Sequence, residues 1–204
     1  MAEKIKKTRP ELLKQRRSLA LFQRFLPTLL LKKQQIQMEI LKVRTQRTRI
    51  RDEIDRMVRQ IEPWLILFSE DLPGRVTDLV RVKSLERGEI NVAGIRLPVL
   101  RQVEYEVAPY SRLVMPAWVD AGVEFVKNLL QERERLRILV EQERLLQSEL
   151  RKVTQRVNLF EKVMIPRAKE NIRTIRINLA EEQTAGVGRS KIAKGKSAGG
   201  EEGA

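Results

Sequence analysis

Residues 12–64 read LLKQRRSLALFQRFLPTLLLKKQQIQMEILKVRTQRTRIRDEIDRMVRQIEPW, and apolar side chains recur there at alternating spacings of three and four residues. Of the sixteen positions that this spacing selects, thirteen are apolar, and the exceptions are Gln15, Lys33 and Arg47. A repeat of about 3.5 residues is typical of a coiled coil, because it keeps one stripe of a helix facing a partner helix. The stretch therefore predicts one long helix that packs along its length against another.

A second stretch, residues 129–164, repeats the same spacing and supplies the partner helix from within the chain. Its polar exceptions, Glu132 and Glu143, are opposite in charge to those of the first stretch. In an antiparallel pair the numbers of facing residues add to a nearly constant total, and this favours Lys33 facing Glu143 and Arg47 facing Glu132. Such buried pairs would fix the register of the two helices. The alternative is that these long side chains reach past the seam to water.

The remaining segments differ in composition from the two long stretches. Val80–Lys83 and Val103–Val107 alternate apolar and polar residues, which predicts strands of a small β-hairpin. Pro27 and Pro166 lie within the apolar stretches and predict kinks. The predicted fold class is all-α, a long antiparallel two-helix coiled coil, or hairpin rod, with a small central β-hairpin or irregular lobe. We expect four parts: an N-terminal long helix over residues 1–70, a central insert of β-hairpin and loops over 71–116, a C-terminal long helix over 117–183, and a flexible basic tail over 184–204.

The composition argues against an enzyme. The chain has no histidine and no cysteine, so the commonest general base and the commonest metal ligands are missing. Residues 188–197 read GRSKIAKGKS, but six residues separate the first glycine from GKS where a phosphate-binding loop has four. We therefore expect no catalytic residues, no metal and no cofactor. No apolar run approaches the ~18 residues of a membrane-spanning helix, which predicts a cytoplasmic protein without direct membrane insertion.

Positive charge is concentrated at the two ends of the chain. The net charge is +14; residues 1–33 hold ten basic and two acidic side chains, and residues 150–197 hold twelve and four. Antiparallel helices would bring these segments together into one strongly positive tip, suited to an acidic partner. Such a tip also allows two alternatives, a coiled-coil scaffold or adaptor and a basic nucleic-acid-binding protein. Nucleic-acid binding is disfavoured because no recognition motif is present and only 4% of residues are aromatic.

Three motifs carry a resemblance to a known family. Arg156-Val-Asn-Leu-Phe-Glu-Lys-Val-Met-Ile-Pro-Arg167, continuing through Ile172-Arg-Thr-Ile-Arg176, resembles the C-terminal helix of the D subunit of V/A-type (vacuolar/archaeal-type) rotary ATPases. Thr8-Arg-Pro-Glu-Leu-Leu-Lys14 resembles the N-terminal entry of that family, and Asn91-Val-Ala-Gly-Ile-Arg-Leu-Pro98 is similar to its central turn. The motifs occur in the family's order, and the resemblance extends to about Leu179.

The resemblance implies a central rotor shaft that transmits torque between a catalytic hexamer and a membrane ion-translocating ring. It implies a non-catalytic subunit, peripheral to the membrane, whose partners are the catalytic and nucleotide-binding A and B subunits, the small F subunit of the stalk and a coupling subunit above the ring. Both chain ends would then project into the hexamer. The residues that this implies at the hexamer bearing are Arg9, Lys14, Arg16, Arg17, Arg167, Lys169, Arg173 and Arg176. Neither the transported ion nor the direction of net ATP turnover follows from the sequence.

Overall fold

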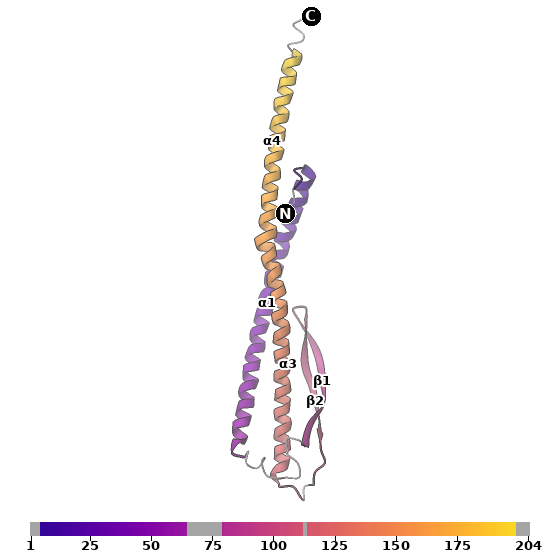
Figure 1. Cartoon of the computed structure of the whole chain (residues 1–204), viewed down its shortest axis with the longest axis vertical. Coiled ribbons are helices and arrows are strands. Elements are labelled where there is room, and N and C mark those ends of the chain that lie inside the picture. Colours follow the sequence, from indigo (N-terminus) through magenta and orange to yellow (C-terminus); the bar gives the residue numbers. More distant parts are fainter. Residues whose placement is uncertain (1–4, 65–78, 112–113, 199–204) are drawn as a thin grey trace. The chain divides into compact units, whose positions relative to one another are not determined.

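The computed structural model describes residues 5–64, 79–111 and 114–198. Along the chain, a two-stranded sheet lies between two long helical stretches (Figure 1). The elements are helix α1 (Arg9–Ile61), a 3₁₀ turn (Glu62–Trp64), strands β1 (Val80–Val92) and β2 (Ile95–Val107), helix α3 (Trp118–Asn158), a π-helical segment η3 (Leu159–Met164) and helix α4 (Ile165–Ala198). The predicted fold class, two long antiparallel helices with a small β-hairpin between them, is confirmed.

Helix α1 begins at Arg9 and ends at Ile61, within the residues 1–70 predicted for the first long helix. Its first turn is closed by the amide of Leu12, which donates to the carbonyl of Thr8 at 3.0 Å. Pro63 follows the last turn and has no amide hydrogen to continue the α-helical bonding, and the chain passes into a 3₁₀ turn over Glu62–Trp64. Residues 65–70 of the predicted first helix lie outside the described part of the chain. Pro27 is inside α1, which continues past it as a helix.

The chain packs as two units, a terminal unit (residues 1–31 and 153–204) and a middle unit (residues 32–152). In the middle unit, α1 and α3 contribute matching apolar side chains to one seam. The fully or nearly buried members of this seam and of the hairpin that covers it are Ile36, Ile40, Val43, Leu97, Ile138, Leu139 and Leu146. A second cluster joins Leu79 and Val80 to the start of α3 at Val119, Val123 and Val126.

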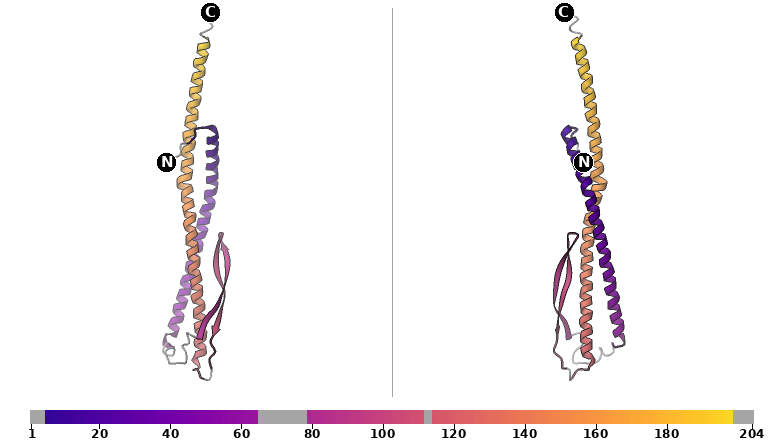
Figure 2. Two further views of the ribbon diagram at one scale, coloured as in Figure 1. Left: turned by 45° about the vertical axis from the view of Figure 1, so that its right-hand side comes forward. Right: turned by 180° about the vertical axis from the view of Figure 1, so that it is seen from behind.

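The β-hairpin lies alongside α3 in the middle unit (Figures 1 and 2). Its strands pair antiparallel from Val80 with Val107 to Val92 with Ile95, and the turn is formed by Ala93 and Gly94 at φ 53° and 78°. Positive φ at both central residues is typical of the tight turns that match the twist of a hairpin. Both strands are longer than predicted, and Pro98 lies within β2.

One hydrogen bond attaches the hairpin to α3. The side-chain amide of Gln142 donates to the carbonyl of Pro98 at 2.6 Å, and the neighbouring Leu97 is only 1% exposed. An ion pair at 3.6 Å between Arg87 and Glu141 adds a contact at the surface. The buried Gln142 is thus satisfied by the hairpin backbone, and this contact fixes the position of the hairpin on the helix.

The charged residues set a register that differs from the prediction. Glu143 accepts hydrogen bonds from Arg44 Nε at 2.7 Å and from Arg47 Nη1 at 2.6 Å, so its predicted pairing with Lys33 is wrong. Glu132 pairs with Arg135 one turn along its own helix, and its predicted pairing with Arg47 is wrong as well. The two helices are shifted by about three turns from the predicted register. The apolar residues of the two helices can face one another in several registers, so the signs of the charges alone did not identify the correct register.

In the terminal unit the beginning of α1 packs against α4. The rings of Phe22 and Phe160 meet edge to face at 5.4 Å, and Asn171 Nδ2 donates to Gln15 Oε1 at 3.3 Å. As residue numbers rise along α1, those of the partners fall, so these helices are antiparallel too. The buried positions on this side are Val153, Val157, Ala168, Ile172 and Ile175.

The C-terminal helix is longer than expected. Helix α4 continues to Ala198, so the predicted end of the helix near residue 183 is wrong, and residues 199–204 of the predicted flexible tail lie outside the described part of the chain. Added Cβ atoms at Gly186 and Gly188 would meet nothing within 4 Å, and Val187 is 57% exposed. At these two glycines α4 therefore has no packing contact with another element among the described residues. Among the described residues, no helix is long and apolar enough to cross a membrane.

Candidate functional site

The terminal unit carries most of the molecule's excess positive charge. Its two segments hold 18 Lys and Arg against 8 Asp and Glu. All the basic residues implied at the bearing lie in this unit, and every one of them is exposed; they are Arg9, Lys14, Arg16, Arg17, Arg167, Lys169, Arg173 and Arg176. They occupy positions between the apolar residues of the two stripes, which is why their side chains point away from the seam.

Four of these residues line one groove between α1 and α4. Arg16 comes from α1, and Lys169, Arg173 and Arg176 come from α4. Leu19 and Ala20 of α1 and Ile172 and Ile177 of α4 line the same groove, whose volume is about 770 Å³. No Asp or Glu is among the residues that line it. The groove can therefore receive an acidic segment that also presents apolar side chains.

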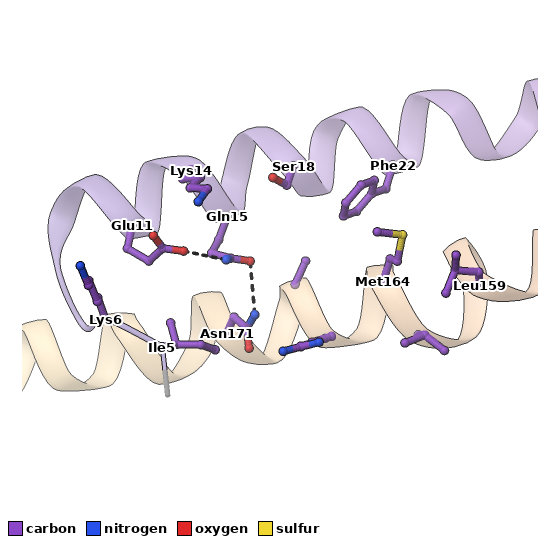
Figure 3. A pocket seen from close by; sticks show the side chains of 13 residues that line it. Ile5, Lys6, Glu11, Lys14, Gln15, Ser18, Phe22, Leu159, Met164 and Asn171 are labelled. Atoms are coloured by element: carbon purple, nitrogen blue, oxygen red, sulfur yellow. Dashed lines mark hydrogen bonds between the residues drawn. The ribbon is translucent and has the colours of Figure 1, made fainter. Parts of the chain in front are cut away.

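Two further predicted residues, Lys14 and Arg167, line a second groove of about 590 Å³ between the same helices (Figure 3). A polar relay crosses its middle. Gln15 Nε2 donates to Glu11 Oε1 at 2.8 Å, while Gln15 Oε1 accepts from Asn171. The other end of the groove is apolar, where Phe22 and Met164 face each other (Figure 3).

The relay was not predicted from the sequence. Gln15 interrupts the apolar stripe of the first helix, and this was the available signal. Because the partner Asn171 lies 156 residues away, only the correct register could identify it. Arg9 and Arg17 line neither groove. Of the eight predicted residues, four therefore line the first groove, two line the second and two line neither.

In the middle unit the residues predicted to set the register have different roles. Arg47 and Glu143 are in contact, and Arg44 and Gln147 also donate to the Glu143 carboxylate. The Glu143 side chain is 8% exposed, whereas those of Arg44 and Arg47 are 54% and 41% exposed. A nearly buried carboxylate with three donors is well satisfied, and this fixes the axial position of α1 on α3. Arg44 was missed, although it lies one turn before Arg47.

A separate, mostly apolar groove of about 460 Å³ lies in the middle unit among α1, the hairpin and α3, and its lining also includes Glu39, Arg49 and Arg135. Val43 and Ile50 line it from α1, Ile90 and Leu100 from the hairpin, and Leu139 from α3. Ile90 is 44% exposed, so part of this apolar surface faces solvent. Such a surface is suited to contact with another protein.

Tyr105 is the residue of the hairpin whose titration is shifted. Burial raises its pKa above the usual 10.0, Arg135 lowers it and Glu132 raises it. Among the described residues, no hydrogen-bond partner reaches its buried hydroxyl. Tyr105 packs against the cluster of Leu79 and Val80, so its role is in packing at the base of the hairpin. No group of three or more His, Cys, Asp or Glu in the described residues could hold a metal ion.

Comparison with known proteins identifies relatives that match over nearly the whole chain. Residues 11–195 match the family of the ATP synthase D subunit. The chain is 44% identical over 191 residues to the V-type ATP synthase D subunit of Borreliella burgdorferi, covering 94% of each protein. It is 30% identical over 197 residues to the V-type ATP synthase D subunit of Chlamydia abortus, covering 96% of this chain and 95% of that protein. The protein of the same name from Chlamydia trachomatis serovar L2 is 32% identical over 200 residues, with 96% and 97% covered.

Proposed function

Because the chain belongs to the family of the ATP synthase D subunit, we propose that it is the central rotor shaft of a V-type rotary ATPase. In this role it transmits torque between the catalytic hexamer and the membrane ion-translocating ring, and so couples ATP synthesis or hydrolysis to ion transport. The observation that carries the proposal is 44% identity over 94% of both chains to a V-type ATP synthase D subunit. The chain itself is the non-catalytic part of an enzyme complex.

The middle unit has the properties that torque transmission requires. Twisting two paired helices shears interlocked side chains, and well-packed seams resist that deformation. Here Ile36, Ile40 and Val43 of α1 pack into a buried seam with α3. The bonds of Arg44 and Arg47 to Glu143 oppose sliding of one helix along the other.

The terminal unit supports the hexamer-facing role. Its exposed basic residues and the groove of Arg16, Lys169, Arg173 and Arg176 offer charge to acidic surfaces around it. Exposed ion pairs are worth only about 0–1 kcal/mol each, so such contacts attract without fixing one orientation. A surface of this kind suits a subunit that must rotate inside the catalytic hexamer. The A and B subunits of the hexamer are the partners proposed for it.

The middle unit is the proposed attachment site for the other subunits. The apolar groove at Val43, Ile90 and Leu139 supports docking of a protein, and the small F subunit of the stalk is the proposed occupant. The coupling subunit above the membrane ring is the second proposed partner. A peripheral position on the cytoplasmic side of the membrane belongs to the same proposal and rests on family membership.

An affinity purification tests the proposal against the scaffold and nucleic-acid alternatives. The tagged chain is expressed in its source cells, the extract is treated with nuclease at physiological salt, and the bound proteins are identified by mass spectrometry. Recovery of the A, B and F subunits, with ATPase activity in the eluate, is the expected result. Recovery of unrelated proteins would support a scaffold, and loss of all partners after nuclease would support nucleic-acid binding.

A further inference from the structure

Two irregularities of the helical backbone lie at nearly the same level of the terminal unit. Helix α1 contains Pro27, and the π-helical segment Leu159–Met164 separates α3 from α4. Phe22 contacts Phe160 within that segment, and Pro27 lies five residues further along α1, a rise of about 7.5 Å. In the antiparallel pairing, Pro27 is therefore within about two turns of the π-helical segment.

Each irregularity weakens the helix in which it occurs. Pro27 has no amide hydrogen, and its ring displaces the carbonyl four residues earlier, that of Gln23. In the opposite helix the amide of Ile165 bonds to the carbonyl of Phe160, five residues back instead of four. Pro166 follows at once and cannot donate either. Both backbones thus lose regular hydrogen bonds at this level.

The side chains of the π-helical segment are not buried deeply enough to replace the lost backbone hydrogen bonds. No residue of the π-helical segment is buried, whereas Val157 before it and Ala168 after it are 2% and 3% exposed. The apolar part of the second groove, where Phe22 faces Met164, opens at the same place (Figure 3). The buried seam is therefore interrupted where the backbones are weakest.

We propose that Pro27 and the segment Leu159–Met164 form a compliant joint at which the two helices of the terminal unit bend together. The part of the unit around Gln15 and Asn171 moves relative to the part around Val153 and Val157, while the ring contact of Phe22 and Phe160 keeps the helices paired. This joint is a property of the isolated chain and does not depend on the proposed rotor function. In a rotor it would let the terminal unit bend without separation of its helices.

Hydrogen exchange followed by mass spectrometry on the purified full chain tests the joint. Amides of residues 160–166 are expected to exchange at least roughly tenfold faster than those of residues 153–157 and 168–175, because helix opening is local. Pro27→Ala is expected to slow exchange in residues 22–28 and also in 160–166. Pro63→Ala, a matched change outside the long helices, is expected to alter neither. Uniform exchange over residues 153–175, or a Pro27→Ala effect confined to α1, would overturn the proposal.

Spin-label distances give an independent readout, since the chain has no cysteine of its own. A pair of labels at Gln155→Cys and Thr174→Cys brackets the π-helical segment. A control pair at Arg133→Cys and Lys152→Cys has the same separation in sequence and lies wholly within α3. The bracketing pair is expected to give the broader distance distribution, and Pro27→Ala to narrow it. Equal widths for the two pairs would contradict a joint.

Discussion

Glu143 shows how one carboxylate sets the register of two long helices. It is almost buried, yet it receives hydrogen bonds from Arg44, Arg47 and Gln147. Removing it would leave two guanidinium groups without their carboxylate, although both are about half exposed and can turn to water. We expect Glu143→Ala to lower the free energy of unfolding in urea by about 1–3 kcal/mol.

Glu124→Ala is the matched control for that measurement. Its partner Lys127 lies on the same helix, and the Glu124 side chain is 66% exposed. The expected change is within about 1 kcal/mol. A double-mutant cycle of Glu143→Ala with Arg47→Ala should show coupling, and strictly additive losses would contradict the register described above.

Tyr105 supplies a prediction about pH. Its pKa is raised above 10.0 by burial in the folded state, so above pH 10 the unfolded chain loses this proton while the folded chain keeps it. The stabilisation that this residue contributes is thus fully present below pH 10 and is lost as the pH rises through the pKa of the folded state. The difference between wild type and Tyr105→Phe, measured in urea at several pH values, isolates this effect from the lysines.

At neutral pH the same variant should be as stable as wild type, or more stable by up to about 1 kcal/mol, because the buried hydroxyl lacks a partner among the described residues. A pH-independent difference between the two proteins would show that the phenol is not held protonated by burial.

At the scale of the elements, the hairpin turn carries removable strain. Ala93 has a φ of 53°, a left-handed conformation that costs an alanine about 1 kcal/mol. Asparagine tolerates that conformation, so Ala93→Asn should slow hydrogen exchange of the β1 and β2 amides, whereas Gly94→Ala at φ 78° should accelerate it. Identical exchange in both variants would mean that the turn does not limit opening of the hairpin.

The long helices could be predicted from the sequence because their signals are local. The 3.5-residue spacing from Leu12 to Trp64 is set by residues within a turn of one another. Register could not be predicted in the same way. The register of α1 against α3 depends on the arginines that reach Glu143, and these residues are distant in sequence. The position of the hairpin depends likewise on the contact of Gln142 with Pro98, 44 residues away. The exposed basic residues were predictable because they lie off the apolar stripe, whereas their grouping into grooves required the register.

The end of α4 shows a second limit of local signals. Glycines at 186 and 188 each cost a helix about 1 kcal/mol relative to alanine, and this favours an earlier end. The helix nevertheless continues to Ala198 without packing at these glycines. The Ala, Lys and Arg residues between Gly188 and Ala198 are good helix formers and support its continuation.

At the scale of the whole molecule, basic charge is concentrated in the terminal unit. Reversing Lys169 and Arg173 to Glu removes two of the four basic groups of the first groove. We expect this change to weaken assembly with the purified A and B subunits by roughly tenfold or more at low salt, and by less at high salt. Arg51→Glu with Arg59→Glu, at exposed positions of α1 in the middle unit, is the control. Equal effects of both double variants would show that net charge alone, and not this groove, directs assembly.

The central claim is that this chain turns inside the ATPase, and rotation can be observed directly. A single cysteine at the exposed Thr45 can be labelled with a probe before assembly, because the chain contains no other cysteine. The complex is then fixed to a surface through its catalytic hexamer and observed as ATP is added. The proposed function predicts continuous rotation of the probe in one direction, which stops when ATP is removed. A probe that stays fixed while the complex hydrolyses ATP would contradict the rotor assignment.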